Sequence, residues 1–221
     1  MIINKNMTLN SLIENNEILA IYPHGSQVYK TMTDKSDFDY IIITTNDYNI
    51  EKEQFSIYDE KIKRNLDFNF YNEEKWLEMC RLNHIDALES MSVIQNNLSI
   101  KNDKEFQIKI DKIKVRQNIS SIVSNAWAKA HKKLTVEQDY SPYIAKKSLW
   151  HCFRILMFGI QIYKYDRIID FCEANSLYNE IVMNECNDWN YYKTKYQEPL
   201  NKLKTEFRKY SEKEWIIFKN S

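Results

Sequence analysis

Glycine is scarce in this chain: Gly25 and Gly159 are the only two in 221 residues. A chain so sparing with glycine keeps one where the backbone must turn sharply or where it approaches a ligand closely. Gly25 lies in the segment Pro-His-Gly-Ser at residues 23–26 and is our first candidate for a functional position.

Net charge and paired cysteines are also lacking. The 31 Lys and Arg residues balance the 31 Asp and Glu residues, so bulk charge does not recruit nucleic acid and a polyanion site must come from local clustering. The four cysteines show neither C-x-x-C spacing nor close pairs, which favours reduced thiols in a cytoplasmic protein. They are Cys80, Cys152, Cys172 and Cys186.

No long apolar run is present. The chain turns polar by Asn4, which argues against a signal peptide, and no segment approaches the length of a membrane span. Hydrophobic residues nevertheless make up 43% and aromatic residues 14% of the chain, as expected for a globular protein.

The apolar pattern predicts an α+β domain at residues 1–110, with a small mixed sheet and flanking helices, followed by an all-α domain at residues 111–221. The charged stretch 99–111 marks the boundary. Expected strands are 17–22, 38–45, 55–58 and 64–71. Expected helices before the boundary are 8–16, 73–81 and 85–94, with a short helix or turn at 26–31. Expected helices beyond it are 113–134, 142–163 with Pro142 at its first position, 166–174, 177–184 and 196–210.

Three residues with oxygen-bearing side chains, Ser26, Asp37 and Asp39, follow Gly25 in the sequence. Ser26 offers a hydroxyl and a backbone N–H group, a natural cradle for an anion. Asp37 and Asp39 open an apolar strand, and the two-residue period of a strand places both carboxylates on one face. Neighbouring carboxylates repel each other unless a cation lies between them, so we expect Mg²⁺ and a nucleotide here.

Gly-Ser, ten intervening residues and Asp-x-Asp in an apolar strand resemble the signature of the DNA polymerase beta-type nucleotidyltransferase superfamily. The superfamily supplies a third carboxylate from a later strand. Asp67 is the candidate, and Asp59 is a competitor within turn-like sequence. Lys30 departs from the pattern, since many members have a second glycine there.

A second cluster lies in the helical region. Lys147, His151 and Arg154 are spaced i, i+4 and i+7, which places them within a narrow arc of one helical face. The same helix is otherwise strongly apolar, so its basic stripe needs an anion or acidic partners. We therefore expect these residues to bind phosphate groups, whereas Lys132 and Lys133 fit a solvated helix end.

The resemblance extends over roughly residues 20 to 160. The segment 83–91 (Asn-His-Ile-Asp-Ala-Leu-Glu-Ser-Met) and the Lys147-x-x-x-His151-x-x-Arg154 helix are similar to segments of the RNA-repair-ligase-associated nucleotidyltransferases. The same order of motifs therefore favours that branch of the superfamily.

The resemblance implies transfer of a nucleoside monophosphate from an NTP to a hydroxyl group, with release of pyrophosphate. It implies two Mg²⁺ or Mn²⁺ ions held by Asp37, Asp39 and Asp67, with Gly25 and Ser26 at the terminal phosphates. The acceptor stays open between an RNA 3′ end, with tRNA as one candidate, and a protein side chain, as in antitoxin-type transferases. The non-enzymatic alternative is a module that binds a nucleotide as a sensor and does not turn it over.

Overall fold

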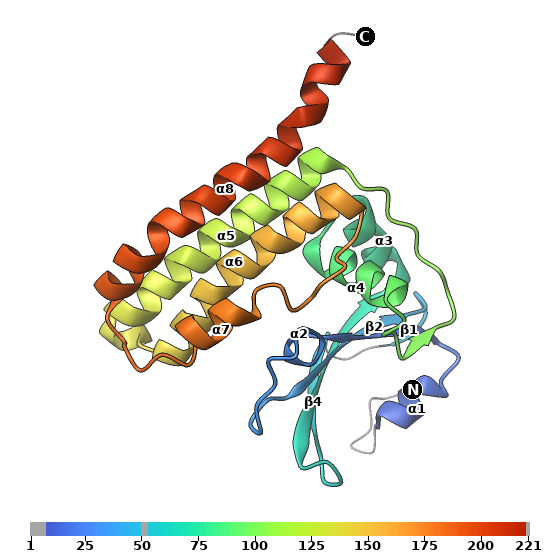
Figure 1. Cartoon of the computed structure of the whole chain (residues 1–221). Helices are drawn as coiled ribbons and strands as arrows, with labels where there is room; N and C mark the ends of the chain where they lie inside the picture. The colour runs from blue at the N-terminus through green and yellow to red at the C-terminus, as the bar shows by residue number, and fades with distance from the viewer. Residues whose placement is uncertain (1–7, 50–52, 220–221) are drawn as a thin grey trace. The chain divides into compact units, whose positions relative to one another are not determined.

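The computed structural model describes residues 8–49 and 53–219, and side chains as far as Tyr210. The chain divides into two compact units, residues 1–109 and 110–221, and each is described by itself (Figure 1). The first unit is α+β and the second is helical, which confirms the predicted fold class.

The first unit is built on a five-stranded mixed sheet with the strand order β3-β4-β2-β1-β5. Strands β2 and β4 run parallel, and every other neighbouring pair is antiparallel. The strands are β1 (Ile18–His24), β2 (Phe38–Thr44), β3 (Gln54–Asp59), β4 (Arg64–Asn72) and β5 (Lys101–Asn102).

Four helices flank this sheet: α1 (Leu9–Ile13), α2 (Ser26–Tyr29), α3 (Glu73–Arg81) and α4 (Ile85–Gln95). Thr8 caps α1, because its hydroxyl accepts from the N–H of Ser11 at 3.1 Å. Asn72 caps α3 in the same way through Lys75 N–H. Polar side chains therefore define where these helices begin.

Strand alternation divides the sheet into two faces with different contents. One face carries a hydrophobic cluster that includes Tyr40, Phe68 and Phe70, packed against the residues of α1. The other face carries Tyr22, which packs on Trp76 of α3 at a ring separation of 6.0 Å. Because Asp39 alternates with Tyr40 along β2, the Asp-x-Asp carboxylates lie on this second face.

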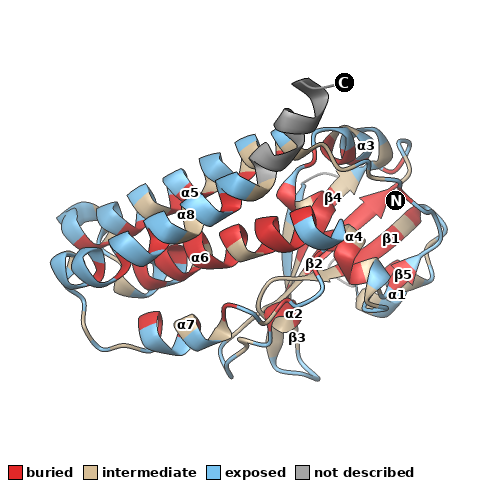
Figure 2. Ribbon diagram, turned by 45° about the horizontal axis from the view of Figure 1, so that its top comes forward, coloured by how far each residue is buried: buried red, intermediate tan, exposed pale blue. Residues whose placement is uncertain are grey.

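The helical unit contains three long helices that pack together and one short helix, α7, against α6 (Figures 1 and 2). Helix α6 is buried along most of its length, and Gly159 lies within it. A Cβ atom at Gly159 would lie 2.6 Å from both Ile119 and Phe207, so this glycine permits close approach of the three helices. Its elements are α5 (Lys112–Thr135), η1 (Glu137–Asp139), α6 (Pro142–Tyr165), α7 (Asn175–Ile181) and α8 (Trp189–Lys219).

The predicted helix at 166–174 is wrong. Asp166 ends α6 in a left-handed conformation with φ 55°. The side chain of Gln161 then takes over the backbone pairing: its oxygen accepts from Ile169 N–H and Asp170 N–H at 2.8 and 2.9 Å, and its amide donates to Asp170 O at 2.9 Å. One buried side chain therefore holds a loop where the apolar pattern suggested a helix.

Two further differences concern element ends. Helix α8 begins at Trp189, seven residues before the expected start, although Pro199 lies inside it. The short strand β5 lies in the stretch that the sequence marked only as a charged boundary. No helix in the described ranges combines the length and apolar character that crossing a membrane requires.

Candidate active site

The Gly25 turn joins β1 to α2 and is tightly fixed. Gly25 has φ 71° and ψ −149°, a region that is essentially restricted to glycine. A Cβ atom on Gly25 would also overlap the carboxylate of Asp39. The side-chain amide of Gln27 donates to His24 O at 3.2 Å and to the main-chain oxygen of Asp39, which ties the turn to β2.

The parallel pairing of β2 and β4 brings two of the predicted carboxylates into register. Asp39 is the direct partner of Asp67, and residues paired in this way present their side chains on the same face. Both side chains are partly exposed. Burial, reinforced by the charge of Asp39, raises the pKa of the neighbouring Tyr40.

The third predicted carboxylate, Asp37, lies one residue before β2. Its Oδ1 accepts a hydrogen bond from the side-chain amide of Asn65 at 3.1 Å. The competing residue Asp59 has a different role, because its Oδ1 accepts from the N–H groups of Lys61 and Ile62 in the β3–β4 turn. This geometry favours Asp67 over Asp59 as the partner of Asp37 and Asp39.

The donor set suits a divalent cation in kind, since carboxylate oxygens are the ligands that Mg²⁺ and Mn²⁺ prefer. The Asp39 carboxylate packs directly against Gly25, at the place where a Cβ atom of any other residue would lie. Within residues 8–49 and 53–219, no three His, Cys, Asp or Glu side chains are arranged closely enough to hold a metal ion by themselves. The roles of Asp37, Asp39 and Asp67 therefore stay predictions.

The structure adds residues beside the turn to which the sequence gave no role. Asn65 orients Asp37, and Glu89 of α4 accepts a hydrogen bond from Tyr29 and lies near His24. Glu89 belongs to the segment 83–91 that carried the family resemblance, which was the available signal. His84 has a structural role, since its side chain caps α4.

The predicted basic stripe lies on α6 in the helical unit. The Arg154 guanidinium is 2.8 Å from His151 Nδ1 and lies over the rings of Trp150 and Phe158 at 5.1 and 5.4 Å. Lys147 is exposed, with its ammonium group 5.4 Å from the centre of the Tyr143 ring. Arg154 and His151 therefore form a close pair, and a phosphate-binding role for all three residues stays a prediction.

The remaining expectation for this unit concerns the end of α5, and two buried tyrosines of α8 also have a clear structural role. Lys132 and Lys133 both form ion pairs with Asp139, which agrees with the expected helix-end role. Tyr192 and Tyr196 are buried at 0% and 3% exposure and stack on each other at 6.2 Å. They are core residues of α8 and not a platform for nucleic-acid bases.

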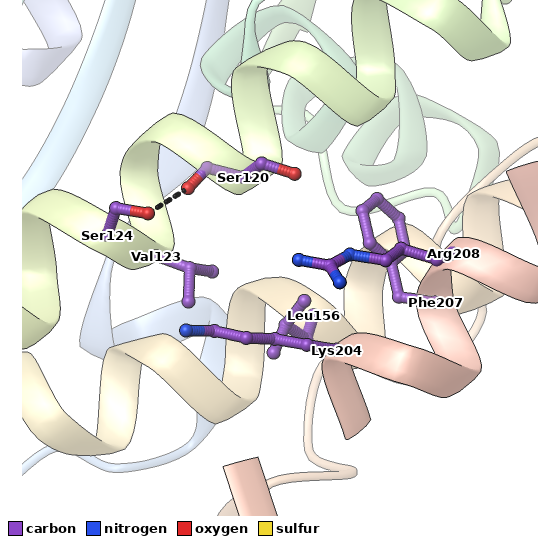
Figure 3. A pocket seen from close by; sticks show the side chains of 7 residues that line it. All are labelled: Ser120, Val123, Ser124, Leu156, Lys204, Phe207 and Arg208. Atoms are coloured by element: carbon purple, nitrogen blue, oxygen red, sulfur yellow. Dashed lines mark hydrogen bonds between the residues drawn. The ribbon is translucent and has the colours of Figure 1, made fainter. Parts of the chain in front are cut away.

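A small hollow of about 60 Å³ lies between α5, α6 and α8 (Figure 3). Lys204, which lines this hollow, also acts electrostatically on Cys152 of α6. Burial raises the pKa of the Cys152 thiol to about 12, and the positive charge of Lys204 opposes this rise. The residues that line the hollow are Ser120, Val123, Ser124, Leu156, Lys204, Phe207 and Arg208.

Comparison with known proteins agrees with the site geometry. Residues 7–83 match the family model described as polymerase beta, nucleotidyltransferase, and this segment includes Gly25, Ser26 and all three carboxylates. This segment is thus a nucleotidyltransferase domain of the polymerase beta type, and it supports a general nucleotidyl-transfer activity. The family implies an NTP substrate and generally uses divalent metal ions.

Among solved structures, the chain is similar to a nucleotidyltransferase-like protein from Exiguobacterium sibiricum 255-15. The two share 11% sequence identity with a TM-score of 0.31, over 92% of this chain and 71% of the other. No curated protein matches the sequence.

Proposed function

We propose that this protein transfers a nucleoside monophosphate from an NTP to the 3′-terminal hydroxyl of an RNA, with two Mg²⁺ or Mn²⁺ ions as cofactors. The observation that carries the proposal is the in-register pair Asp39 and Asp67, with Gly25 packed against the Asp39 carboxylate. A tight glycine turn beside paired carboxylates suits a triphosphate that is held at its phosphates and aligned at the α-phosphorus.

In the proposed reaction the acceptor oxygen bonds to the α-phosphorus, the bond from that phosphorus to the β-phosphate oxygen breaks, and pyrophosphate leaves. The acceptor loses its hydroxyl proton. Divalent cations bound at Asp37, Asp39 and Asp67 would neutralise the phosphates and lower the pKa of the attacking hydroxyl. Ser26 and the N–H groups around Gly25 would hold the terminal phosphates.

The predicted role of Lys147, His151 and Arg154 as phosphate ligands forms part of this proposal. So does the assignment to the RNA-repair-ligase-associated branch, which favours RNA as the acceptor. Residues 110–221 also contain 19 Lys and Arg against 13 Asp and Glu, a net charge of +6 that supports a polyanionic partner. A cytoplasmic location is proposed because all four cysteines are free thiols.

The test incubates the protein with each α-labelled NTP, Mg²⁺ or Mn²⁺, and either total RNA or cell lysate. Label on RNA is expected, and periodate oxidation of the RNA, which destroys its 3′-terminal diol, should abolish labelling. Label confined to protein would replace RNA with a protein side chain as the acceptor. An absence of any labelled product, despite NTP binding, would favour a nucleotide-sensing module.

A further inference from the structure

Glu89 is a buried carboxyl group that the proposed reaction does not use. It lies in α4 with 3% of its surface exposed, although it has no metal ligand or catalytic role in the scheme above. Burying a carboxylate is costly unless hydrogen bonds or charges compensate it. The partners of Glu89 therefore indicate what this burial accomplishes.

Both partners flank the Gly25 turn, and both lie close to the same carboxylate oxygen of Glu89. The hydroxyl of Tyr29, the last residue of α2, donates to Oε2. Nδ1 of His24, the last residue of β1, lies 3.9 Å from the same atom. The rings of His24 and Tyr29 also contact each other edge to face at 6.3 Å. One carboxylate thus joins the residue before the turn to the end of the helix after it.

The other side of the turn is fixed independently. Gly25 packs against the Asp39 carboxylate, and the Gln27 amide bonds to main-chain oxygens of His24 and Asp39. The turn is therefore held between β2 on one side and Glu89 on the other. Loss of the Glu89 contacts would remove one of these two restraints on the turn.

We propose that Glu89 is a positioning residue, which holds the Gly25–Ser26 turn where its donors meet the terminal phosphates of the NTP. This inference rests on the proposed function, because it assigns the phosphates to that turn. Glu89 acts through Tyr29 and His24 and touches neither substrate nor reacting atoms. Its contribution is geometric, since a displacement of about 1 Å at a reacting site can cost roughly 10²-fold in rate.

The test compares two ligands that differ only at the phosphates. Glu89→Gln keeps the size of the side chain but removes its charge, and Tyr29→Phe removes a single hydroxyl. Affinities for a non-hydrolysable NTP and for the matching nucleoside monophosphate are measured with Mg²⁺ by titration calorimetry. Glu60→Gln is the matched control, because it makes the same change at an exposed position in the β3–β4 turn.

A positioning role predicts that Glu89→Gln weakens NTP binding roughly 10- to 100-fold, and that affinity for the monophosphate stays within about twofold of wild type. Tyr29→Phe should change affinities in the same direction by a smaller factor, and it keeps the test decisive if Glu89→Gln does not fold. A merely structural role would lower thermal stability and weaken both ligands together, which would overturn the inference.

Wild-type NTP affinity in both variants would also overturn the inference while leaving the proposed function standing. Wild-type protein that binds no NTP would overturn both. The two failures are therefore distinguishable in one set of titrations.

Discussion

The two units of this chain carry opposite net charges, although the whole chain is neutral. Residues 1–109 contain 12 Lys and Arg against 18 Asp and Glu, a net charge of −6, whereas residues 110–221 have a net charge of +6. The acidic unit holds the carboxylates that suit cations, and the basic unit holds the cationic stripe that suits anions. A composition averaged over the chain conceals this division.

The two glycines of the chain, one in each unit, also have different structural roles. Gly25 takes a backbone conformation that other residues avoid, and it touches the carboxylate of Asp39. Gly159 is helical and makes room for Ile119 and Phe207. The first glycine serves the site and the second serves packing. We therefore expect mutations in the two units to have separable effects on chemistry, binding and stability.

The largest effect should come from the carboxylates. We expect Asp37→Ala, Asp39→Ala and Asp67→Ala each to reduce nucleotidyl transfer by roughly 10²- to 10³-fold or more, because each removes charge that the reaction depends on. Thermal unfolding should show an intact fold, with equal or higher stability, since repulsion between carboxylates is relieved. Substantial transfer by Asp67→Ala would reopen Asp59 as the third ligand.

Arg154 should produce the next largest effect, and it acts on binding rather than on chemistry. We expect Arg154→Ala to weaken NTP affinity by about 1.5–3 kcal/mol, the range for hydrogen bonds to charged groups. Lys147→Ala should have a smaller effect, because its exposed ammonium group is well solvated. Lys132→Ala is the control, since Lys132 pairs with Asp139 away from the stripe.

Wild-type nucleotide affinity in Arg154→Ala and Lys147→Ala would remove the basic stripe from the proposal. The difference in charge between the units would then need another explanation. Equilibrium titration of a non-hydrolysable NTP decides between the two outcomes.

The glycines allow a matched comparison between site and packing. We expect Gly159→Ala to lower the free energy of unfolding by about 1–3 kcal/mol through overpacking, with unchanged activity of the folded protein. Gly25→Ala should cost a similar amount through backbone strain, about 1–3 kcal/mol, but should also reduce transfer. Chemical denaturation and single-turnover assays on folded protein measure the two quantities. Equal activity in both variants would show that the Gly25 turn does not serve the reaction.

The sequence predicted the parts of this molecule that depend on short-range pattern. The apolar run after Asp39 could only be a buried strand, and alternation placed Asp37 and Asp39 on its polar side. The helix predicted at 73–81 matches α3 at both ends. In the structure Asn72 caps it and acidic residues fill its first turn, which fixes where it begins.

The features that escaped prediction depend on contacts distant in sequence. Glu89 lies 60 residues from the tyrosine that donates to it, and nothing in the pattern of α4 shows that its carboxyl group is buried. The loop after α6 is held by the side chain of Gln161, so its apolar residues imitate a helical period without forming a helix. Such contacts follow only from the assembled fold.

The smallest expected effect concerns His151, and the structure changes its interpretation. A purely basic stripe would use His151 as a cation, and its effect would fade when the imidazole loses its proton. A guanidinium group can only donate, so the 2.8 Å contact with Arg154 requires His151 Nδ1 to accept. The imidazole is then neutral and carries its proton on Nε2, where it can donate one ordinary hydrogen bond.

We therefore expect His151→Ala to weaken NTP affinity by only about 0.5–1.5 kcal/mol, the net value of a neutral hydrogen bond. Because the neutral form is the active one, this loss should be the same at pH 7.5 and at pH 9. His151→Gln offers a sharper comparison, since an amide can accept from Arg154 and donate to a ligand at once, and it should retain most of the affinity. A loss that disappears at pH 9 would show that His151 works as an imidazolium cation, and the contact with Arg154 would then have to break when nucleotide binds.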